Sequence, residues 1–226
     1  MSMATERIAD HGGLRAVFFD FDGTLVDSYA AITASVNHVR AAHNLSPLPE
    51  AEVRRCVGRG PYYLLEHTVP GVELPRDLLL YRQHHPSVLR LGTRLLPGAA
   101  ETVALLHRAG LRIAVISNKP RDFTGQLLNY LGLSASVDLY LGPEDVALPK
   151  PAPDMLQSAL RQLGVSSDET LYIGDMTVDI ATARAAGVAV WVVPTGSDDP
   201  ATLEAAKPDR ILRDLQELPV ALGFGG

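Results

Sequence analysis

The chain contains four short, mainly apolar segments in which hydrophobic residues follow one another instead of alternating with polar ones. A continuous apolar run is typical of a strand that is covered on both faces, as in a parallel sheet. Three of the four segments end in Asp or Ser, so polar groups stand where these strands stop. The predicted strands are residues 16–20, 111–117, 171–175 and 188–193.

Helical spacing of apolar residues is found in four further stretches that precede or follow these strands. A glycine comes directly after each stretch, and glycine ends helices well because it tolerates the left-handed backbone conformation. Alternating strands and helices predict an α/β fold with a doubly wound parallel sheet. The predicted helices are residues 99–109, 122–131, 153–163 and 178–186.

The region from about Ser28 to about Arg94 breaks this alternation. It shows no convincing strand, and apolar residues recur at helical intervals, for example at Ile32, Val36 and Val39. We therefore predict a helical cap inserted after the first strand. The predicted core is 1–26 and 95–226, the predicted cap is 27–94, and the predicted hinges are 25–27 and 92–97.

Composition excludes several classes of protein. The 226 residues are 46% hydrophobic and 20% charged, which suits a globular core better than a disordered chain. The formal net charge of −6 gives no electrostatic footprint for nucleic acid. No apolar run has the ~18–20 residues of a membrane span, and residues 1–13, read as a frayed N-terminus, lack a signal-peptide core. Cys56 is the single cysteine of the chain and gives no sign of an oxidising compartment, so we expect a cytoplasmic protein. We also expect a monomer or small homo-oligomer with no nucleic-acid or membrane partner.

Carboxylates gather at the predicted strand ends, where parallel sheets bind their ligands. Asp20 and Asp22 follow the first strand and, being two residues apart, face the same side. Neighbouring carboxylates repel each other unless a cation or a shared proton relieves them. Asp175 ends another strand, with Asp179 one helical turn later. Oxygen ligands without Cys or His favour Mg²⁺ over Zn²⁺.

A Mg²⁺ site suggests a phosphate substrate, and groups suited to phosphate oxygens stand near the same strand ends. Ser117 and Asn118 offer a hydroxyl and an amide before a predicted helix. Lys150 lies between two prolines, which present its ammonium group in a defined direction. Taken singly, Ser117 and Asn118 also fit helix capping, Lys150 a solvated loop charge, and Asp179 a first-turn helix acid.

Four motifs in this order resemble those of the haloacid-dehalogenase-like (HAD) hydrolase superfamily. They are Asp20-Phe21-Asp22-Gly23-Thr24, Ser117-Asn118, Lys150-Pro151, and Gly174-Asp175 with Asp179. Further similarity to the phosphoglycolate-phosphatase-like branch lies in Asp27-Ser28, the cap at this position, Ser117-Asn118-Lys119-Pro120 and Lys150-Pro151-Ala152-Pro153-Asp154. The resemblance implies a Rossmann-like core and Mg²⁺-dependent hydrolysis of a small phosphorylated metabolite, with phosphoglycolate first among the substrates.

The resemblance also implies a role for each motif residue. Asp20 would attack phosphorus to form an aspartyl-phosphate, and Asp22 would act as general acid and then general base. Mg²⁺ would be held by the carboxylates of Asp20 and Asp175 and by the backbone carbonyl of Asp22. Asp179 would support either the metal or Lys150. The predicted phosphate-binding residues are Gly23, Ser117, Asn118 and Lys150.

The predicted cap offers Arg55 and Arg59 as residues for substrate specificity. Arg59, between two glycines, can pair with a carboxylate or a second phosphate, or it is a surface arginine. The adjacent His84 and His85 are interpreted as packing or surface residues, because neighbours on a helix point in different directions.

Two other functions remain open from the sequence. A phosphosugar mutase would share the aspartyl-phosphate and pass the phosphoryl group to a substrate hydroxyl instead of water. A non-catalytic regulatory binding module would keep the fold without turnover.

Overall fold

A six-stranded parallel sheet forms the centre of the computed structural model, which describes residues 13–224. The strand order is β5-β4-β1-β6-β7-β8, and every neighbouring pair is parallel. The predicted frayed segment therefore lies outside the described residues, apart from Gly13. The strands are β1 (Ala16–Phe19), β4 (Arg112–Ile116), β5 (Leu139–Leu141), β6 (Thr170–Gly174), β7 (Ala189–Val192) and β8 (Arg210–Ile211).

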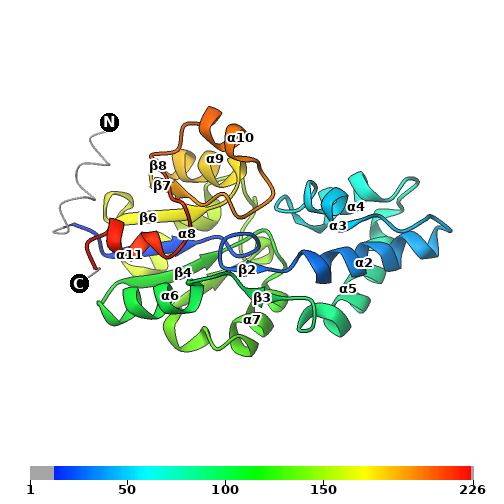
Figure 1. Cartoon of the computed structure of the whole chain (residues 1–226), viewed down its shortest axis with the longest axis horizontal. Coiled ribbons are helices and arrows are strands. Elements are labelled where there is room, and N and C mark those ends of the chain that lie inside the picture. The colour runs from blue at the N-terminus through cyan, green and yellow to red at the C-terminus, as the bar shows by residue number, and fades with distance from the viewer. Residues whose placement is uncertain (1–12, 225–226) are drawn as a thin grey trace.

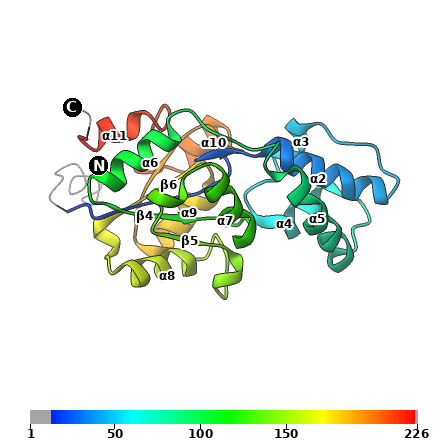
Figure 2. The same ribbon diagram turned by 90° about the horizontal axis from the view of Figure 1, so that it is seen from below.

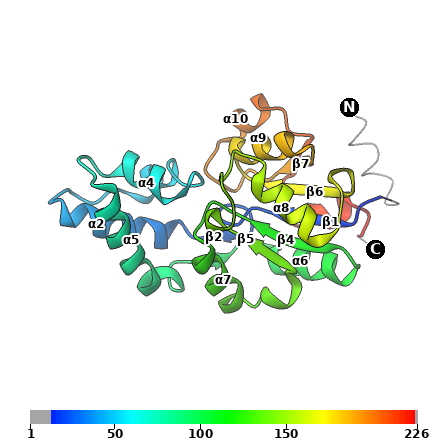
Figure 3. The same ribbon diagram turned by 180° about the vertical axis from the view of Figure 1, so that it is seen from behind.

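Helices cover both faces of this sheet, so the predicted doubly wound α/β fold is confirmed. Figures 1 and 2 show α6 and α7 on one side of the sheet, and Figure 3 shows α9 and α10 on the other. The four predicted helices end within two residues of their predicted bounds. The helices are α6 (Ala99–Arg108), α7 (Arg121–Tyr130), α8 (Asp154–Leu163), α9 (Thr177–Ala186), α10 (Pro200–Ala205) and α11 (Glu217–Ala221), with short 3₁₀ turns η1 (Ser134–Ser136), η2 (Pro143–Asp145) and η3 (Ser167–Glu169).

Alternate residues of β1 are buried in two separate hydrophobic cores. Val17 and Phe19 belong to the core under α6 and α7, whereas Ala16 and Phe18 belong to the core under α8 and α9. All four side chains are fully buried. Apolar contact on both faces explains why this strand reads as a continuous hydrophobic run.

Four helices between β1 and α6 form a separate unit beyond the end of β1 (Figure 1). The chain enters it through β2 and leaves it through β3, which pair antiparallel. These two short strands lie at the predicted hinges, and the division into a core and a cap at residues 27–94 stays our interpretation. The elements are β2 (Val26–Asp27), α2 (Tyr29–Ala42), α3 (Glu50–Arg54), α4 (Gly60–Thr68), α5 (Leu74–Leu89) and β3 (Arg94–Leu95).

Four of the strands were absent from the sequence prediction. β2, β3 and β8 have two residues each and β5 has three, too few to show a hydrophobic pattern. Across residues 13–224, no helix is both long enough and apolar enough to traverse a bilayer.

His85 is a buried packing residue of α5, as interpreted from the sequence. Its ring stacks on Tyr81 with 5.0 Å between centroids and meets Phe123 of α7 edge-on at 4.8 Å. His84, next to it, stacks instead on His38 of α2 at 4.2 Å. Burial lowers the pKa of His85 to about 2.

Since the folded protein holds His85 neutral, lowering the pH should destabilise it. The unfolded chain protonates this histidine below its ordinary pKa of 6.5, whereas the folded chain does so only near pH 2. The stabilisation is complete above pH 6.5 and is lost as the pH falls. Between pH 7 and pH 5, the free energy of unfolding, from urea titrations, should fall by about 2 kcal/mol more in the wild type than in His85→Asn.

His67→Asn is the matched control, because His67 lies exposed on α4. This variant should keep the wild-type dependence on pH. Equal losses in the wild type and His85→Asn would contradict the prediction.

Candidate active site

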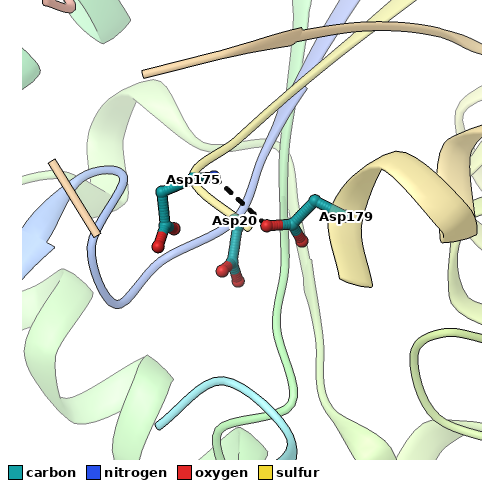
Figure 4. A group of neighbouring side chains, drawn as sticks. All are labelled: Asp20, Asp175 and Asp179. Atoms are coloured by element: carbon teal, nitrogen blue, oxygen red, sulfur yellow. Dashed lines mark hydrogen bonds between the residues drawn. The ribbon is translucent and has the colours of Figure 1, made fainter. Parts of the chain in front are cut away.

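Three carboxylates from two strand ends and one helix meet at the carboxyl edge of the sheet. Asp20 directly follows β1, Asp175 directly follows β6, and Asp179 lies in the first turn of α9. One oxygen from each lies within 4.8 Å of the others, and Figure 4 shows the three side chains grouped together. This pairing follows from the register, because β1 and β6 are adjacent and run in the same direction.

Asp20 is buried, and one of its oxygens has no hydrogen-bond donor. Lys150 Nζ lies 2.9 Å from Asp20 Oδ1, which makes an ion pair. The approach lacks hydrogen-bond geometry, so no donor among the described residues satisfies Oδ1. Burial raises the pKa of Asp20 to about 6, although the charge of Lys150 opposes this.

Asp175 is held in place from both sides. Its Oδ1 accepts a hydrogen bond from Thr24 Oγ1 at 2.7 Å, and its Oδ2 accepts one from the Ser197 backbone N–H at 3.3 Å. Burial, followed by the charges of Asp20 and Asp179, raises the pKa of Asp175 well above its ordinary value. A buried carboxyl group in this position is costly to ionise unless a cation stands beside it.

Asp179, unlike Asp20, accepts two hydrogen bonds at each of its carboxylate oxygens. Oδ1 accepts from Lys150 Nζ at 2.7 Å and from Tyr172 Oη at 3.0 Å. Oδ2 accepts from the backbone N–H groups of Asp175 at 3.2 Å and Met176 at 3.1 Å. These contacts fit the predicted support of Lys150 and leave Asp179 little capacity to bind a metal directly.

Lys150 connects Asp20 with Asp179 from a fully buried position. Its Nζ also lies 3.1 Å from Tyr172 Oη, whose ring sits on β6. Burial lowers the pKa of Lys150, but the charges of Asp179 and Asp20 outweigh it and raise that pKa above its ordinary value. Tyr172 was not among the predicted site residues, because inside an apolar run its ring reads as core.

Asp22 lies apart from the three clustered carboxylates and has its own cation. Lys119 Nζ approaches both Asp22 oxygens, at 3.1 and 3.2 Å, and Ser28 Oγ donates to Oδ1 at 2.5 Å. Lys119 is buried and was missed as a site residue. A signal was present, since the chain has only three lysines and this one follows a predicted strand end.

The predicted phosphate-binding residues lie around the same edge but are partly engaged. Asn118 Nδ2 donates to the carbonyls of Gly58 at 3.1 Å and Lys150 at 3.0 Å, so this amide joins α2–α5 to the core. Gly23 N–H donates to Val26 at 2.8 Å, and a Cβ at Gly23 would come 2.5 Å from Asp175 Oδ2. Ser117 Oγ accepts from the Lys119 backbone N–H at 3.3 Å. Phosphate binding by these residues stays a prediction.

A small pocket of about 40 Å³ lies between the strand ends and the helices α2, α4 and α5. Arg55 and Arg59 are exposed and do not line it; the Arg59 guanidinium instead lies 5.1 Å from the centre of the Tyr63 ring. Their contact with substrate therefore also stays a prediction. The lining comprises Asp20, Asp22, Ser117, Asn118, Lys119 and Pro120 from the core, and Ile32, Val57, Gly58, Gly60, Pro61, Leu64 and Tyr81 from the predicted cap.

The loop after β7 was missed from the sequence, and it closes over Asp175. A Cβ at Gly196 would come 1.5 Å from Asp175 Oδ2, so only glycine allows this approach. Arg54 of α3 donates to the carbonyls of Thr195 at 2.7 Å and Gly196 at 2.8 Å. Its guanidinium also lies 4.2 Å from the centre of the Tyr29 ring. Arg54 thus links the helical unit to the loop that holds Asp175.

The donor set fits a hard divalent cation. Four carboxylates, counting Asp22, face two ammonium groups, which leaves a formal charge of 2 − 4 = −2 when all are ionised. Burial and the charges of Asp20 and Asp179 raise the pKa of Asp175, and a cation beside these carboxylates would favour their ionised forms. All clustered ligand atoms are oxygens, which suits Mg²⁺.

Comparison with known proteins agrees with this fold and site. The family model for haloacid dehalogenase-like hydrolases matches residues 17–193, and the chain belongs to that family. The matched span runs from β1 to the end of β7 and includes every residue of the carboxylate cluster.

Several proteins similar to this chain are named as phosphoglycolate phosphatases. Phosphoglycolate phosphatase of Rhodospirillum rubrum is 36% identical over 193 residues, covering 80% of each chain. The plasmid-encoded phosphoglycolate phosphatase of Cupriavidus necator is 33% identical and covers 92% of each chain. The crystal structure of a predicted phosphoglycolate phosphatase from Haemophilus somnus superposes with a TM-score of 0.84 at 26% identity, covering 91% of this chain and 96% of that one. The chain is a phosphatase of the family.

Gly196→Ala should disable the enzyme by pushing Asp175 out of place. The added methyl group overlaps a buried carboxylate that Thr24 and Ser197 already hold. Hydrolysis of phosphate esters should fall at least tenfold, and thermal unfolding should occur at a lower temperature. Gly13→Ala, where nothing lies within 4 Å of the new Cβ, should match the wild type in both assays. Full activity in Gly196→Ala would show that the loop after β7 can move without displacing Asp175, and it would contradict the prediction.

Proposed function

We propose that this phosphatase hydrolyses a small phosphate monoester through an aspartyl-phosphate on Asp20 and depends on Mg²⁺. The observation that carries the proposal is the buried Asp20, whose Oδ1 forms an ion pair with Lys150 and lies close to Asp175 and Asp179. 2-Phosphoglycolate is the proposed substrate, because the relatives that cover most of this chain carry that name.

The proposed reaction has two displacements at phosphorus. In the first, an Asp20 oxygen forms a bond to phosphorus while the ester P–O bond breaks, and Asp22 donates its proton to the departing oxygen. In the second, a water molecule attacks phosphorus, Asp22 takes its proton, and the bond to Asp20 breaks to release inorganic phosphate. Asp22 suits both steps because it lines the pocket together with Asp20.

The carboxylates of Asp20 and Asp175 and the backbone carbonyl of Asp22 would hold the metal. When bound, Mg²⁺ supplies positive charge that lets an anionic nucleophile approach an anionic phosphoryl group. Lys150 adds a second positive charge, oriented by Asp179 at 2.7 Å. Ser117, Asn118 and Gly23 complete the proposed phosphate-binding edge.

Hydrolysis is proposed over phosphosugar mutation because the relatives that cover most of this chain are named phosphoglycolate phosphatases. A non-catalytic binding module would not need three buried carboxylates within 4.8 Å of one another at the ends of two strands.

Asp20→Asn should abolish turnover without weakening the fold. An amide is a poor nucleophile, so kcat with 2-phosphoglycolate should fall by several orders of magnitude. Because the pKa of Asp20 is raised to about 6 in the folded protein, ionisation of Asp20 lowers the free energy of unfolding. This loss increases as the pH rises through about 6 and has reached its full size by pH 8. Without metal at pH 8, the free energy of unfolding should therefore not fall. Asp122→Asn, on the exposed start of α7, is the control and should keep full activity. Undiminished hydrolysis by Asp20→Asn would refute the nucleophile.

Asp22→Asn should slow both displacements by about 10²–10⁴-fold on 2-phosphoglycolate. Acetyl phosphate, whose acetate leaves without needing a proton, should still phosphorylate this variant. The second displacement stays slow, so acid-quenched protein should contain covalently bound phosphate. Absence of any phosphorylated protein, despite slowed turnover, would argue against the two-step reaction.

A further inference from the structure

The cap side of the pocket is apolar except at one residue. Seven residues from the helical unit line it, and only Tyr81 of α5 has a polar side-chain atom. Tyr81 is 4% exposed, and no described residue forms a hydrogen bond with its hydroxyl group. Because Tyr81 lines the pocket, its hydroxyl group is placed to donate a hydrogen bond to a bound ligand.

Packing holds the Tyr81 ring in position without using its hydroxyl group. The ring stacks on His85, which itself packs against Phe123 of the core. Burial, and then the charge of Asp22, raises the pKa of Tyr81, so the phenol keeps its proton and remains a donor. The neighbouring His85 is neutral at physiological pH and brings no competing charge.

Lys119 supplies a positive charge on the core side of the same pocket. Its ammonium group contacts the two oxygens of Asp22 and has a third proton for a further acceptor. Its charge also lowers the pKa of His85, after burial, which places it near the ring that supports Tyr81. The pocket therefore combines a neutral donor and a cation around a small apolar space.

We propose that Tyr81 and Lys119 determine specificity by binding a carboxylate in the alcohol part of the substrate. Tyr81 donates a hydrogen bond to one carboxylate oxygen, and Lys119 offsets the negative charge. The substrate class is a phosphate ester of a hydroxy acid, which carries a phosphoryl group for Asp20 and a carboxylate for Tyr81 and Lys119, all three of which line the pocket. This assignment rests on the proposed function and adds the cap residue that recognises the leaving group.

The test compares 2-phosphoglycolate with ethyl phosphate, in which a methyl group replaces the carboxylate. In Tyr81→Phe, which keeps the ring, the preference for 2-phosphoglycolate should fall about 10–100-fold in the ratio of kcat/KM values, mainly through KM. Tyr62→Phe is the matched control, since Tyr62 belongs to α4, the helix before α5, is 55% exposed and does not line the pocket. It should retain the wild-type preference.

A second measurement separates this inference from the proposed reaction. Calorimetric binding of 2-phosphoglycolate to Mg²⁺-loaded Asp20→Asn needs no turnover, and adding Tyr81→Phe or Lys119→Met should weaken it at least tenfold. Failure of the wild type to hydrolyse either ester would overturn the proposed function, while this binding arm still decides the role of Tyr81. An unchanged preference in Tyr81→Phe, an equal loss on both esters, or equal binding of both esters by Asp20→Asn would overturn the inference.

Discussion

The central constraint on this structure is that like charges are buried together at one edge of the sheet. Asp20, Asp175 and Asp179 come within ion-binding distance of one another, and Lys150 alone stands among them. Such a cluster costs folding free energy unless it is compensated, and the surrounding hydrogen bonds compensate only part of it. The strands, the loop after β7 and the donors on Asp179 all act to keep these groups in place.

The four central parallel strands of the core could be predicted because a strand buried on both faces has a continuous run of apolar residues. Four of the covering helices, α6 to α9, could be predicted as well, since a glycine follows each predicted stretch, whereas the short α10 and α11 were not predicted. β5 and β8 were not, because a strand at the edge of the sheet is short and partly exposed. Residues 28–94 were predicted only as a helical region, because the way α2 to α5 pack depends on contacts distant in the sequence.

The site shows the same division between local and distant information. Asp20 and Asp22 stand at a predictable strand end, and the structure places them around one pocket. Lys119, Tyr81 and Arg54 were not assigned roles, because each acts through a partner from a remote segment. Gly196 carries no chemical group at all, so only the geometry of its approach to Asp175 reveals its importance.

The short ribbon of β2 and β3 has a consequence for how such enzymes diversify. Val26 pairs with Leu95, and Asp27 pairs with Arg94, so the inserted unit leaves and re-enters the core at neighbouring points. Paired residues of this kind are only about 5 Å apart. An inserted segment of any length can therefore join these two points while the register of the main sheet stays the same. The strand ends that carry Asp20 and Asp175 can therefore keep their spacing whatever the length of the segment between β2 and β3.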